Sequence, residues 1–470
     1  WLSHTCPPFE RKRVNTMDEN KELFETMPVA KALTKMAIPT IISQLITMIY
    51  NLADTYFIGR TNNPYMVAAA SLSYVLFFIL TALSNLFGVG GGSQISRLLG
   101  QKRYEEAKKV CSFSFYGTIC VSLLYSLSCL FFMDPLLRLL GATDNTIAYS
   151  CQYTLWVIVV GGVPSCLSMT MAHLLRSEGY ARYASYGLSG GGILNMILDP
   201  LFMFVIMQPG QEVMGAALAT MLSNCVSLVY FAFMFLRLRK DTVLCLSPNM
   251  MVPGKASIRA VFAVGVPSAI GSLMACLSNT VVNKLSSGYN DFAVAAMGIV
   301  KKIDMLPMNV GMGLCQAMVP MVAYNYSTRN YRRMRSFTNA ARISGVVFAG
   351  ICIVVMELFA PQVIALFIND GDTVGYGVDF LRINVLATPL MICNFQMSYT
   401  FQAMGKGAES LLLTSCRQGI INIPLLFLMN WVAGLYGIIW TQLLADSITV
   451  VISFAFYRHT IQKLKASAAT

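Results

Sequence analysis

The residues of this chain that could do chemistry are a few carboxylates set in long apolar stretches. Asp199 is the clearest, because no other charged side chain occurs between Tyr183 and Gln211. Asn195 precedes it by four residues, so an amide and a carboxylate share one helical face. Pro200 follows, and its missing N–H leaves backbone carbonyls unpaired beside the acid. Such an oxygen-rich pocket suits a proton or a hard cation; a structural, helix-capping or interhelix role is the alternative.

A second carboxylate, Asp54, lies in the stretch ITMIYNLADTYFIGR at residues 46–60. Tyr50, Asn51 and Asp54 fall on one helical face, and this polar stripe needs a polar neighbour. An interfacial ion pair with Arg60, about 9 Å along the helix, is the alternative explanation. We expect instead that Asp54 shares a proton or a cation with the helix that carries Asp199.

Other kinds of chemistry find no support in the sequence. His4, His173 and His459 are too scattered for a catalytic triad or a metal cluster. Thirteen cysteines occur singly, without a Cys-x-x-Cys pair, as expected of small core residues. The glycine runs at 87–94 and 187–192 lack the Gly-Lys-Ser/Thr of a phosphate loop and predict close helix packing or a bend. We therefore expect neither an enzyme nor a cofactor, and no ATP-driven pump.

The elements that position these acids are membrane-spanning helices. The chain is 56% hydrophobic and 12% charged, with a mean hydropathy of +0.60, which is unusual for a soluble domain. Apolar runs of about 20 residues, the length that crosses a bilayer, predict twelve spans. Their approximate limits are 36–58, 66–96, 110–133, 147–172, 184–208, 214–236, 258–286, 292–322, 336–358, 374–401, 409–430 and 436–457.

The net charge of +12 reflects topology rather than nucleic-acid binding. If both chain ends are cytoplasmic, 28 of the 34 Lys and Arg residues fall in loops and tails on that side, Lys406 and Arg417 among them. The positive-inside rule then places both termini in the cytoplasm. The remaining six are Arg60, Arg138, Lys284, Lys301, Lys302 and Arg382.

The two halves of the chain repeat each other. A shift of 228 places Pro39 on Pro267 and Asn51 on Asn279. Because each half holds six spans, the copies share one orientation, as in secondary transporters built from parallel repeats. The predicted fold is all-α, with twelve transmembrane helices in two six-helix lobes related by a pseudo-two-fold axis along the membrane normal. The predicted segments are a cytoplasmic tail at 1–35, an N-lobe at 36–237, a linker at 238–257, a C-lobe at 258–458 and a tail at 459–470.

The repeat does not extend to the acids. Asp54 falls on Val282, and Asp199 falls on Ile423 or Leu426, so neither acid has an acidic counterpart. This pattern predicts that one lobe carries the ion-coupling site.

The C-lobe offers weaker candidates for a cavity or substrate site. Lys301 and Asp304, at i and i+3, predict a local ion pair lining the cavity, with a gating or substrate role as the alternative. Asp446, which matches Asn224 in the repeat, is a similar candidate.

Several motifs together resemble one transporter family. They are NLADTYFIGR, FGVGGGSQISRLLGQKRYEEAKK, LLRSEG and NMILDPLF, with GMGLCQAMVPMVAYNYSTRNYRR and INIPLLF in the second half. The chain resembles multidrug and toxic compound extrusion (MATE) transporters of the bacterial MepA-like and DinF-like branch, from about residue 28 to 458. In that branch an Asp, an Asn and Asp one turn apart, and a Thr form a cation site. By motif these residues correspond to Asp54, Asn195, Asp199 and Thr220.

The resemblance implies secondary active efflux of lipophilic, often cationic, drug-like compounds in exchange for H⁺ or Na⁺, with Na⁺ held by Asp54, Asn195 and Asp199. It implies a protein in the bacterial cytoplasmic membrane, and we expect a monomer. The alternative is a flippase of the related superfamily, for lipid-linked precursors or polysaccharides. Such flippases place several basic residues in the cavity, whereas the candidates here are acids.

Overall fold

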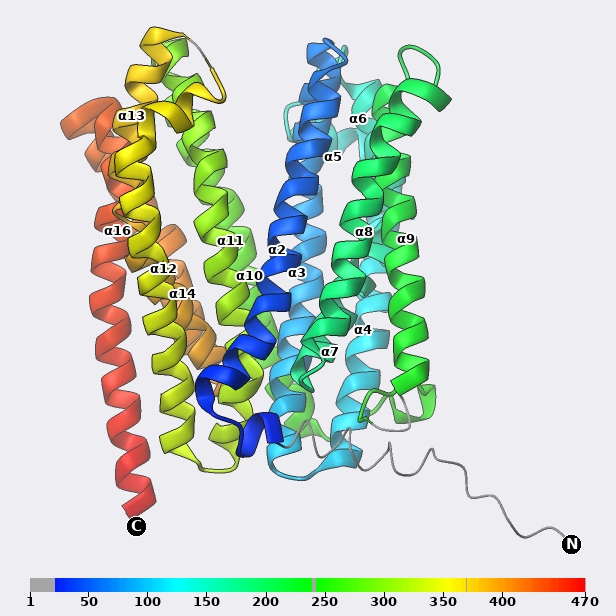
Figure 1. Ribbon diagram of the computed structural model, residues 1–470. Helices are drawn as coiled ribbons and strands as arrows, with labels where there is room; N and C mark the ends of the chain where they lie inside the picture. The colour runs from blue at the N-terminus through cyan, green and yellow to red at the C-terminus, as the bar shows by residue number, and fades with distance from the viewer. Residues whose placement is uncertain (1–21, 239–241, 369, 470) are drawn as a thin grey trace, which may run out of the picture.

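The computed structural model describes residues 22–238, 242–368 and 370–469, and these residues are almost entirely helical (Figure 1). The α-helices are α2 (Val29–Gly59), α3 (Pro64–Gly100), α4 (Tyr104–Phe131), α5 (Met133–Leu139), α6 (Ile147–Thr154), α7 (Gly162–Ser177), α8 (Ala181–Leu201), α9 (Glu212–Leu238), α10 (Lys255–Ser286), α11 (Asp291–Ser327), α12 (Tyr331–Ala365), α13 (Gly371–Val385), α14 (Thr388–Ala403), α15 (Gly407–Ser415) and α16 (Asn422–Ala469). Three π-helical segments, η1 (Leu155–Val160), η2 (Phe202–Ile206) and η4 (Cys416–Ile420), and the 3-10 turn η3 (Pro248–Met250) interrupt them.

The described helices account for twelve membrane crossings. Nine are long and apolar enough to span a bilayer, and two bent pairs, α6–η1 with α7 and α13 with α14, raise the number to eleven. One of the nine, Gly407–Leu464, has 58 residues, or about 87 Å of helix, far more than a bilayer core of about 30 Å needs. The chain reverses within it at Gly434, whose φ of 58° favours glycine, so this stretch crosses twice. The prediction of twelve spans is therefore confirmed.

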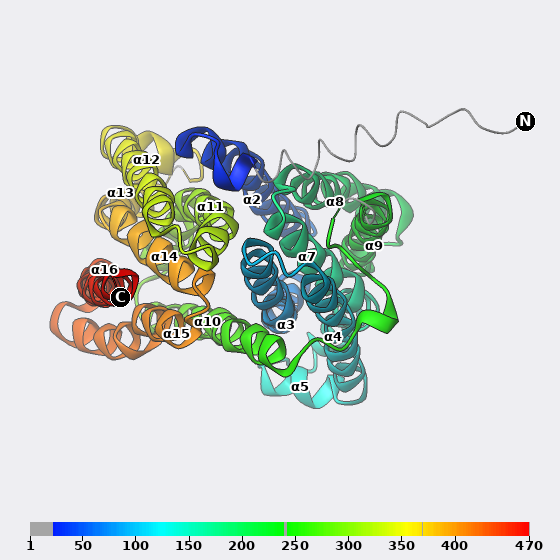
Figure 2. The same ribbon diagram turned by 90° about the horizontal axis from the view of Figure 1, so that it is seen from below.

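The helices form two groups that lie side by side. One, the N-lobe, contains α2 to α9, and the other, the C-lobe, contains α10 to α16 (Figures 1 and 2). The start of α2 and the end of α16 lie at the same end of the bundle (Figure 1), which we call the terminal face; the other end is the opposite face. At the opposite face, Asn63, Asn290 and Asp370 cap α3, α11 and α13 by accepting hydrogen bonds from first-turn backbone N–H groups.

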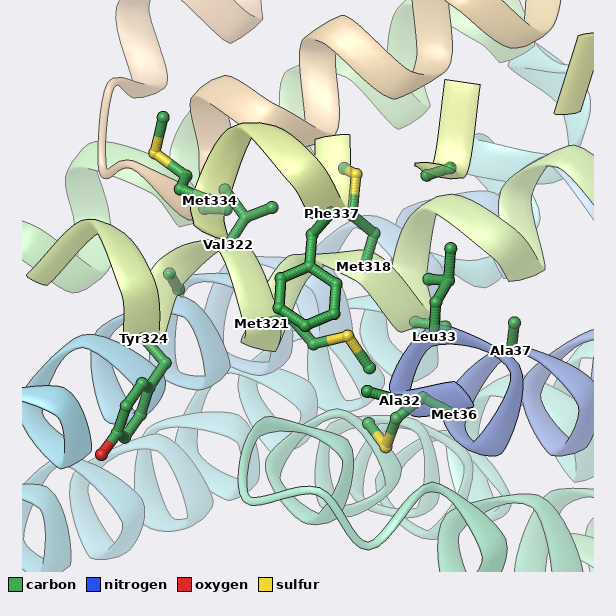
Figure 3. Packing of buried hydrophobic residues seen from close by; sticks show 14 of the residues in the cluster. Ala32, Leu33, Met36, Ala37, Met318, Met321, Val322, Tyr324, Met334 and Phe337 are labelled. Atoms are coloured by element: carbon green, nitrogen blue, oxygen red, sulfur yellow. The ribbon is translucent and has the colours of Figure 1, made fainter. Parts of the chain in front are cut away.

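The two lobes are joined near the terminal face by a hydrophobic cluster. Leu33 and Met36 of α2 pack with Met318 and Met321 of α11 and with Phe337 of α12 (Figure 3). The segment that precedes α2 also joins this cluster, because Phe24 is only 3% exposed and stacks on Tyr324 with ring centroids 5.0 Å apart. These contacts close the terminal face between α2 and the α11–α12 pair.

A second contact between the lobes runs along α3 and α10, where glycines bring two backbones together. A Cβ on Gly265 of α10 would lie 1.9 Å from the carbonyl oxygen of Leu86, and a Cβ on Gly90 would lie 2.4 Å from that of Val261. Asn85 also donates to the Ser272 hydroxyl at 3.0 Å. The glycine run at 87–94 therefore serves close helix packing, as its sequence predicted.

Toward the opposite face the hydrophobic clusters stay within single lobes. One cluster, around Leu76, Leu137 and Val213, is made only of N-lobe residues. Another, around Val300 and Phe380, is made only of C-lobe residues. The lobes are thus packed together at the terminal face and packed separately at the opposite face.

Helices extend into both segments that the sequence predicted as tails. α2 begins at Val29, inside the segment predicted as an N-terminal tail, while residues 1–21 of that tail lie outside the described residues. α16 continues to Ala469, through the segment predicted as a C-terminal tail. Arg417 was wrongly placed in a loop: it lies in η4 within the eleventh span and is 6% exposed, since a buried partner compensates its charge.

Candidate functional site

Asp199, Asn195 and Thr220 form a connected polar group inside the N-lobe. Asp199 is fully buried and Asn195 is 2% exposed. The Asn195 side-chain amide donates to Asp199 Oδ1 at 3.1 Å and lies 3.2 Å from the hydroxyl of Thr220 on α9. The i, i+4 spacing on α8 accounts for the first contact, and the packing of α9 on α8 supplies the second.

Asp54 on α2 faces the same group. Its carboxylate and that of Asp199 lie within electrostatic reach of each other, and its Oδ2 accepts a hydrogen bond from the Tyr153 hydroxyl at 3.5 Å. The alternative ion pair with Arg60 does not form, because that guanidinium turns toward the hydroxyl of Tyr56. Asp54, Tyr153, Asn195, Asp199 and Thr220 are called the N-lobe centre below.

A glycine of the second glycine run brings α2 and α8 close enough for this meeting. A Cβ on Gly192 would lie 2.9 Å from a ring carbon of Tyr50 and 3.2 Å from Ile46. Asp54 is one turn beyond Tyr50, and Asn195 is about one turn beyond Gly192, so the two polar residues reach similar heights on adjacent helices. Asn51, on the same stripe of α2, hydrogen-bonds Tyr50 rather than the acids.

The N-lobe centre has more buried acceptors than donors. Asp54 Oδ1, Asn195 Oδ1 and Asp199 Oδ2 are buried and accept no hydrogen bond within the described part of the chain. No described Lys or Arg lies within 4 Å of either carboxylate. A buried acceptor without a donor costs on the order of 1–3 kcal/mol if the group is neutral and more if it is charged. The arrangement therefore suits a proton or a small cation.

Irregular helix flanks the polar positions in both lobes. Tyr153 lies two residues before η1, Asp199 lies three residues before η2, and Arg417 lies within η4. π-helical turns inside α-helices occur often at functional sites, because they leave carbonyl groups without their usual partners. Pro200 explains the break at η2, as the sequence suggested.

The C-lobe candidates have different partners from those expected. Lys301 and Asp304 do not form the predicted ion pair, because the Lys301 ammonium donates to Asn283 Oδ1 of α10 at 2.6 Å. Asp304 contacts Asn384 of α13 and lies within electrostatic reach of Asp446. The pairing of each side chain with a neighbouring helix overrides the weak local attraction at i and i+3.

Asp446 is the most completely satisfied acid of the C-lobe. It is fully buried and forms a salt bridge of 2.6 Å with Arg417. This pair links two helices and is not a local one, so the sequence did not reveal it.

Groups of three or more His, Cys, Asp or Glu side chains that could hold a metal ion do not occur among the described residues. The oxygens available in the N-lobe centre come from two carboxylates, an amide and hydroxyls. Such hard oxygen ligands fit Na⁺ or a proton.

Sequence reasoning missed Tyr153 and the Arg417–Asp446 pair. The one signal for Tyr153 was a hydroxyl-bearing side chain in the apolar run at 147–172. No comparable signal marked the pair, since Arg417 and Asp446 are 29 residues apart and meet only through helix packing.

Twelve spans in two similar lobes, closed together at one face and with a polar centre buried inside one lobe, define an integral membrane transporter. The profile of the MatE family matches residues 39–201 and 267–428, once in each lobe. The multidrug export protein MepA of Staphylococcus saprophyticus is 33% identical over 431 residues, which cover 92% of this chain and 94% of that protein. MepA of Staphylococcus aureus strain MSSA476 is 34% identical over 432 residues, with the same coverage. The chain belongs to the MatE family, whose members are transporters and not enzymes.

Solved structures agree with the fold. The chain matches the outward-facing conformation of a multidrug resistance MATE family transporter of the MOP superfamily with a TM-score of 0.88 and 25% identity, over 95% of this chain and 98% of that one. A MATE crystal structure in the straight conformation gives a TM-score of 0.89, and one in the bent conformation gives 0.86. These matches confirm the predicted all-α fold of twelve transmembrane helices in two lobes.

Proposed function

We propose that this protein exports lipophilic, often cationic, drug-like compounds in exchange for H⁺ or Na⁺ bound at the N-lobe centre. The observation that carries the proposal is the set of three buried acceptor oxygens, on Asp54, Asn195 and Asp199, that no described donor satisfies. Two nearby carboxylates favour uptake of a cation because their charges repel in a site shielded from water. The multidrug export named for the staphylococcal relatives supports the substrate class.

Transport proceeds by alternating access in this proposal. The terminal face is the cytoplasmic face, as the positive-inside rule requires, and the packing of the lobes there corresponds to a state open to the outside. Ion binding from outside neutralises Asp54 and Asp199 and favours this state, while drug binding favours the state open to the cytoplasm. Reversing a 1:99 population to 99:1 takes a difference of about 5.5 kcal/mol in ligand affinity between the two states.

The flippase alternative gains no support from the site. The N-lobe centre contains no basic residue, and the guanidinium of Arg417 in the C-lobe is already paired with a carboxylate. An anionic phosphate would meet unneutralised carboxylates in the N-lobe, which is unfavourable.

The test is gradient-driven export of ethidium from proteoliposomes that contain the purified protein. One set imposes a pH gradient without Na⁺, and a second imposes a Na⁺ gradient at equal pH, so that the two coupling ions are told apart. We expect Asp199→Asn to lose gradient-driven export. Asp144→Asn, which alters an acid that is 88% exposed at the opposite face, is the matched control and should transport normally. Normal gradient-driven export by Asp199→Asn would refute the assignment of the site.

A further inference from the structure

The C-lobe has a polar centre of its own, made of Asp304, Asn394, Arg417, Gln442 and Asp446. Asp446 Oδ1 accepts hydrogen bonds from Arg417 Nε at 2.6 Å and from the Asn394 amide at 3.0 Å. Its Oδ2 accepts one from the Gln442 amide at 2.8 Å. Both oxygens of this fully buried carboxylate are therefore satisfied, unlike those of Asp54 and Asp199.

Arg417 is fixed in place by its surroundings. Its guanidinium carbon lies 4.5 Å from the centroid of the Phe395 ring, a cation–π contact from α14. The side chain is 7% exposed and comes from the π-helical segment η4. A guanidinium stays charged under all ordinary conditions, so it cannot vary its charge during a transport cycle.

Apart from this guanidinium, the N-lobe centre and the C-lobe centre contain similar chemical groups. Each centre has two carboxylates, which are Asp54 and Asp199 in one lobe and Asp304 and Asp446 in the other. Each also has side-chain amides close to a carboxylate, such as Asn195 in the N-lobe. Asp304 lies within electrostatic reach of both Arg417 and Asp446. The C-lobe centre differs in that it contains a cation that is part of the chain, the guanidinium of Arg417.

Arg417 is not part of the duplicated scaffold. The corresponding helix of the N-lobe has no Lys or Arg between Tyr183 and Gln211, and Asp446 corresponds to the neutral Asn224. The pair is therefore particular to the C-lobe. Its guanidinium compensates a buried negative charge that would otherwise have no partner.

We propose that the C-lobe centre is a monovalent-cation site whose cation is the side chain of Arg417, so that this lobe exchanges no ion. The number of ions exchanged per drug molecule is then set by the N-lobe centre alone. The inference rests on the proposed ion-coupled export and adds to it a fixed stoichiometry. Removing the guanidinium converts the C-lobe centre into a second exchangeable site for H⁺ or Na⁺, because Asp446 and Asp304 are left without a cation.

The experiment measures the ion-to-drug ratio in proteoliposomes, with ethidium as the transported cation. The ethidium gradient that just stops net transport is determined against a set gradient of the coupling ion. We expect Arg417→Gln to raise the ratio by one ion relative to the unmodified chain. Arg417→Lys keeps a cation at the site and should leave the ratio unchanged. An unchanged ratio in a folded, transporting Arg417→Gln variant would overturn the inference.

A double variant keeps the inference testable if the single substitution does not fold. Arg417→Gln with Asp446→Asn removes both charges together, so no uncompensated charge remains between them. We expect this variant to export ethidium with the ratio of the unmodified chain. Loss of ion-coupled export in the folded double variant would show that the pair itself takes part in exchange, which contradicts the inference. Retained coupling in Asp199→Asn would instead refute the proposed function, so the two failures are distinguishable.

Discussion

Replacing Gly265 by alanine should disturb the closed terminal face more than the fold of either lobe. The new Cβ would lie 1.9 Å from the Leu86 carbonyl oxygen and 2.8 Å from its carbonyl carbon, and both atoms are backbone. A comfortable carbon–oxygen contact is about 3.3 Å, so α3 and α10 must separate by roughly 1.4 Å. Because these helices belong to different lobes, the clash is relieved when the lobes move apart.

The size of the effect follows from the cost of overpacking. An added methyl group in a tightly packed interface costs about 1–3 kcal/mol. A cost of that size, borne only by the state closed at the terminal face, shifts the equilibrium about 5- to 150-fold toward the state open there. Ethidium export should fall, because one state of the cycle becomes poorly populated.

The measurement is a distribution of distances between spin labels at the opposite face. Labels on cysteines introduced at Asn62 and Ser287, in a chain whose native cysteines are replaced, report the separation of the lobes. We expect Gly265→Ala to increase the population with the shorter distance. Gly350→Ala in α12 is the control, since a Cβ there meets nothing within 4 Å. Identical distributions for Gly265→Ala and the unmodified chain would refute the reasoning.

Two further predictions concern the terminal face. Glu178 is 5% exposed, accepts a hydrogen bond from the Val243 N–H at 3.4 Å, and has its pKa raised to about 8 by burial. In the unfolded chain the pKa of this carboxyl is about 4.3. At a pH between the two pKa values, the unfolded chain has released the proton and the folded chain still holds it. The free energy of unfolding therefore falls as pH rises through this range, by at most about 1.4 kcal/mol per pH unit. Glu178→Gln should therefore match the unmodified chain in Tm at pH 5 and exceed it at pH 8; a constant Tm difference would contradict this account. Arg333 donates to the Phe24 carbonyl at 2.7 Å, so Arg333→Gln should speed amide hydrogen exchange in residues 22–27, whereas Arg332→Gln, at an exposed position, should not; equal exchange in both variants would count against this contact.

Sequence patterns predicted much of the fold because a bilayer restricts the secondary structure that a chain can adopt. Every backbone polar group in hydrocarbon must be paired, so apolar runs such as 66–96 become helices whatever their neighbours are. The repeat of Pro39 and Pro267 predicted two lobes. The glycine runs predicted close packing or a bend, and Gly90 and Gly192 show close packing at a lobe interface and beside the N-lobe centre.

The sequence could predict contacts between polar residues within one helix but not contacts between helices. Asn195 and Asp199 are one helical turn apart, so the sequence alone implied their contact. The same local rule failed for Lys301 and Asp304, because amides on two other helices hold these side chains apart. A weak i, i+3 attraction within one helix cannot compete with hydrogen bonds to neighbouring helices in a packed interior.

By itself, the sequence determined the helices, their number and the two-lobe repeat. It also identified the acids within membrane spans, which are costly there and are therefore candidate functional residues. Only the tertiary structure decided which side chains share a pocket, since Tyr153 reaches Asp54 and Arg417 reaches Asp446 across helices far apart in the chain. It also decided where the lobes touch. The physical reason is that the cost of a buried polar group is local and can be read from one helix, whereas the partner that offsets this cost depends on how helices pack.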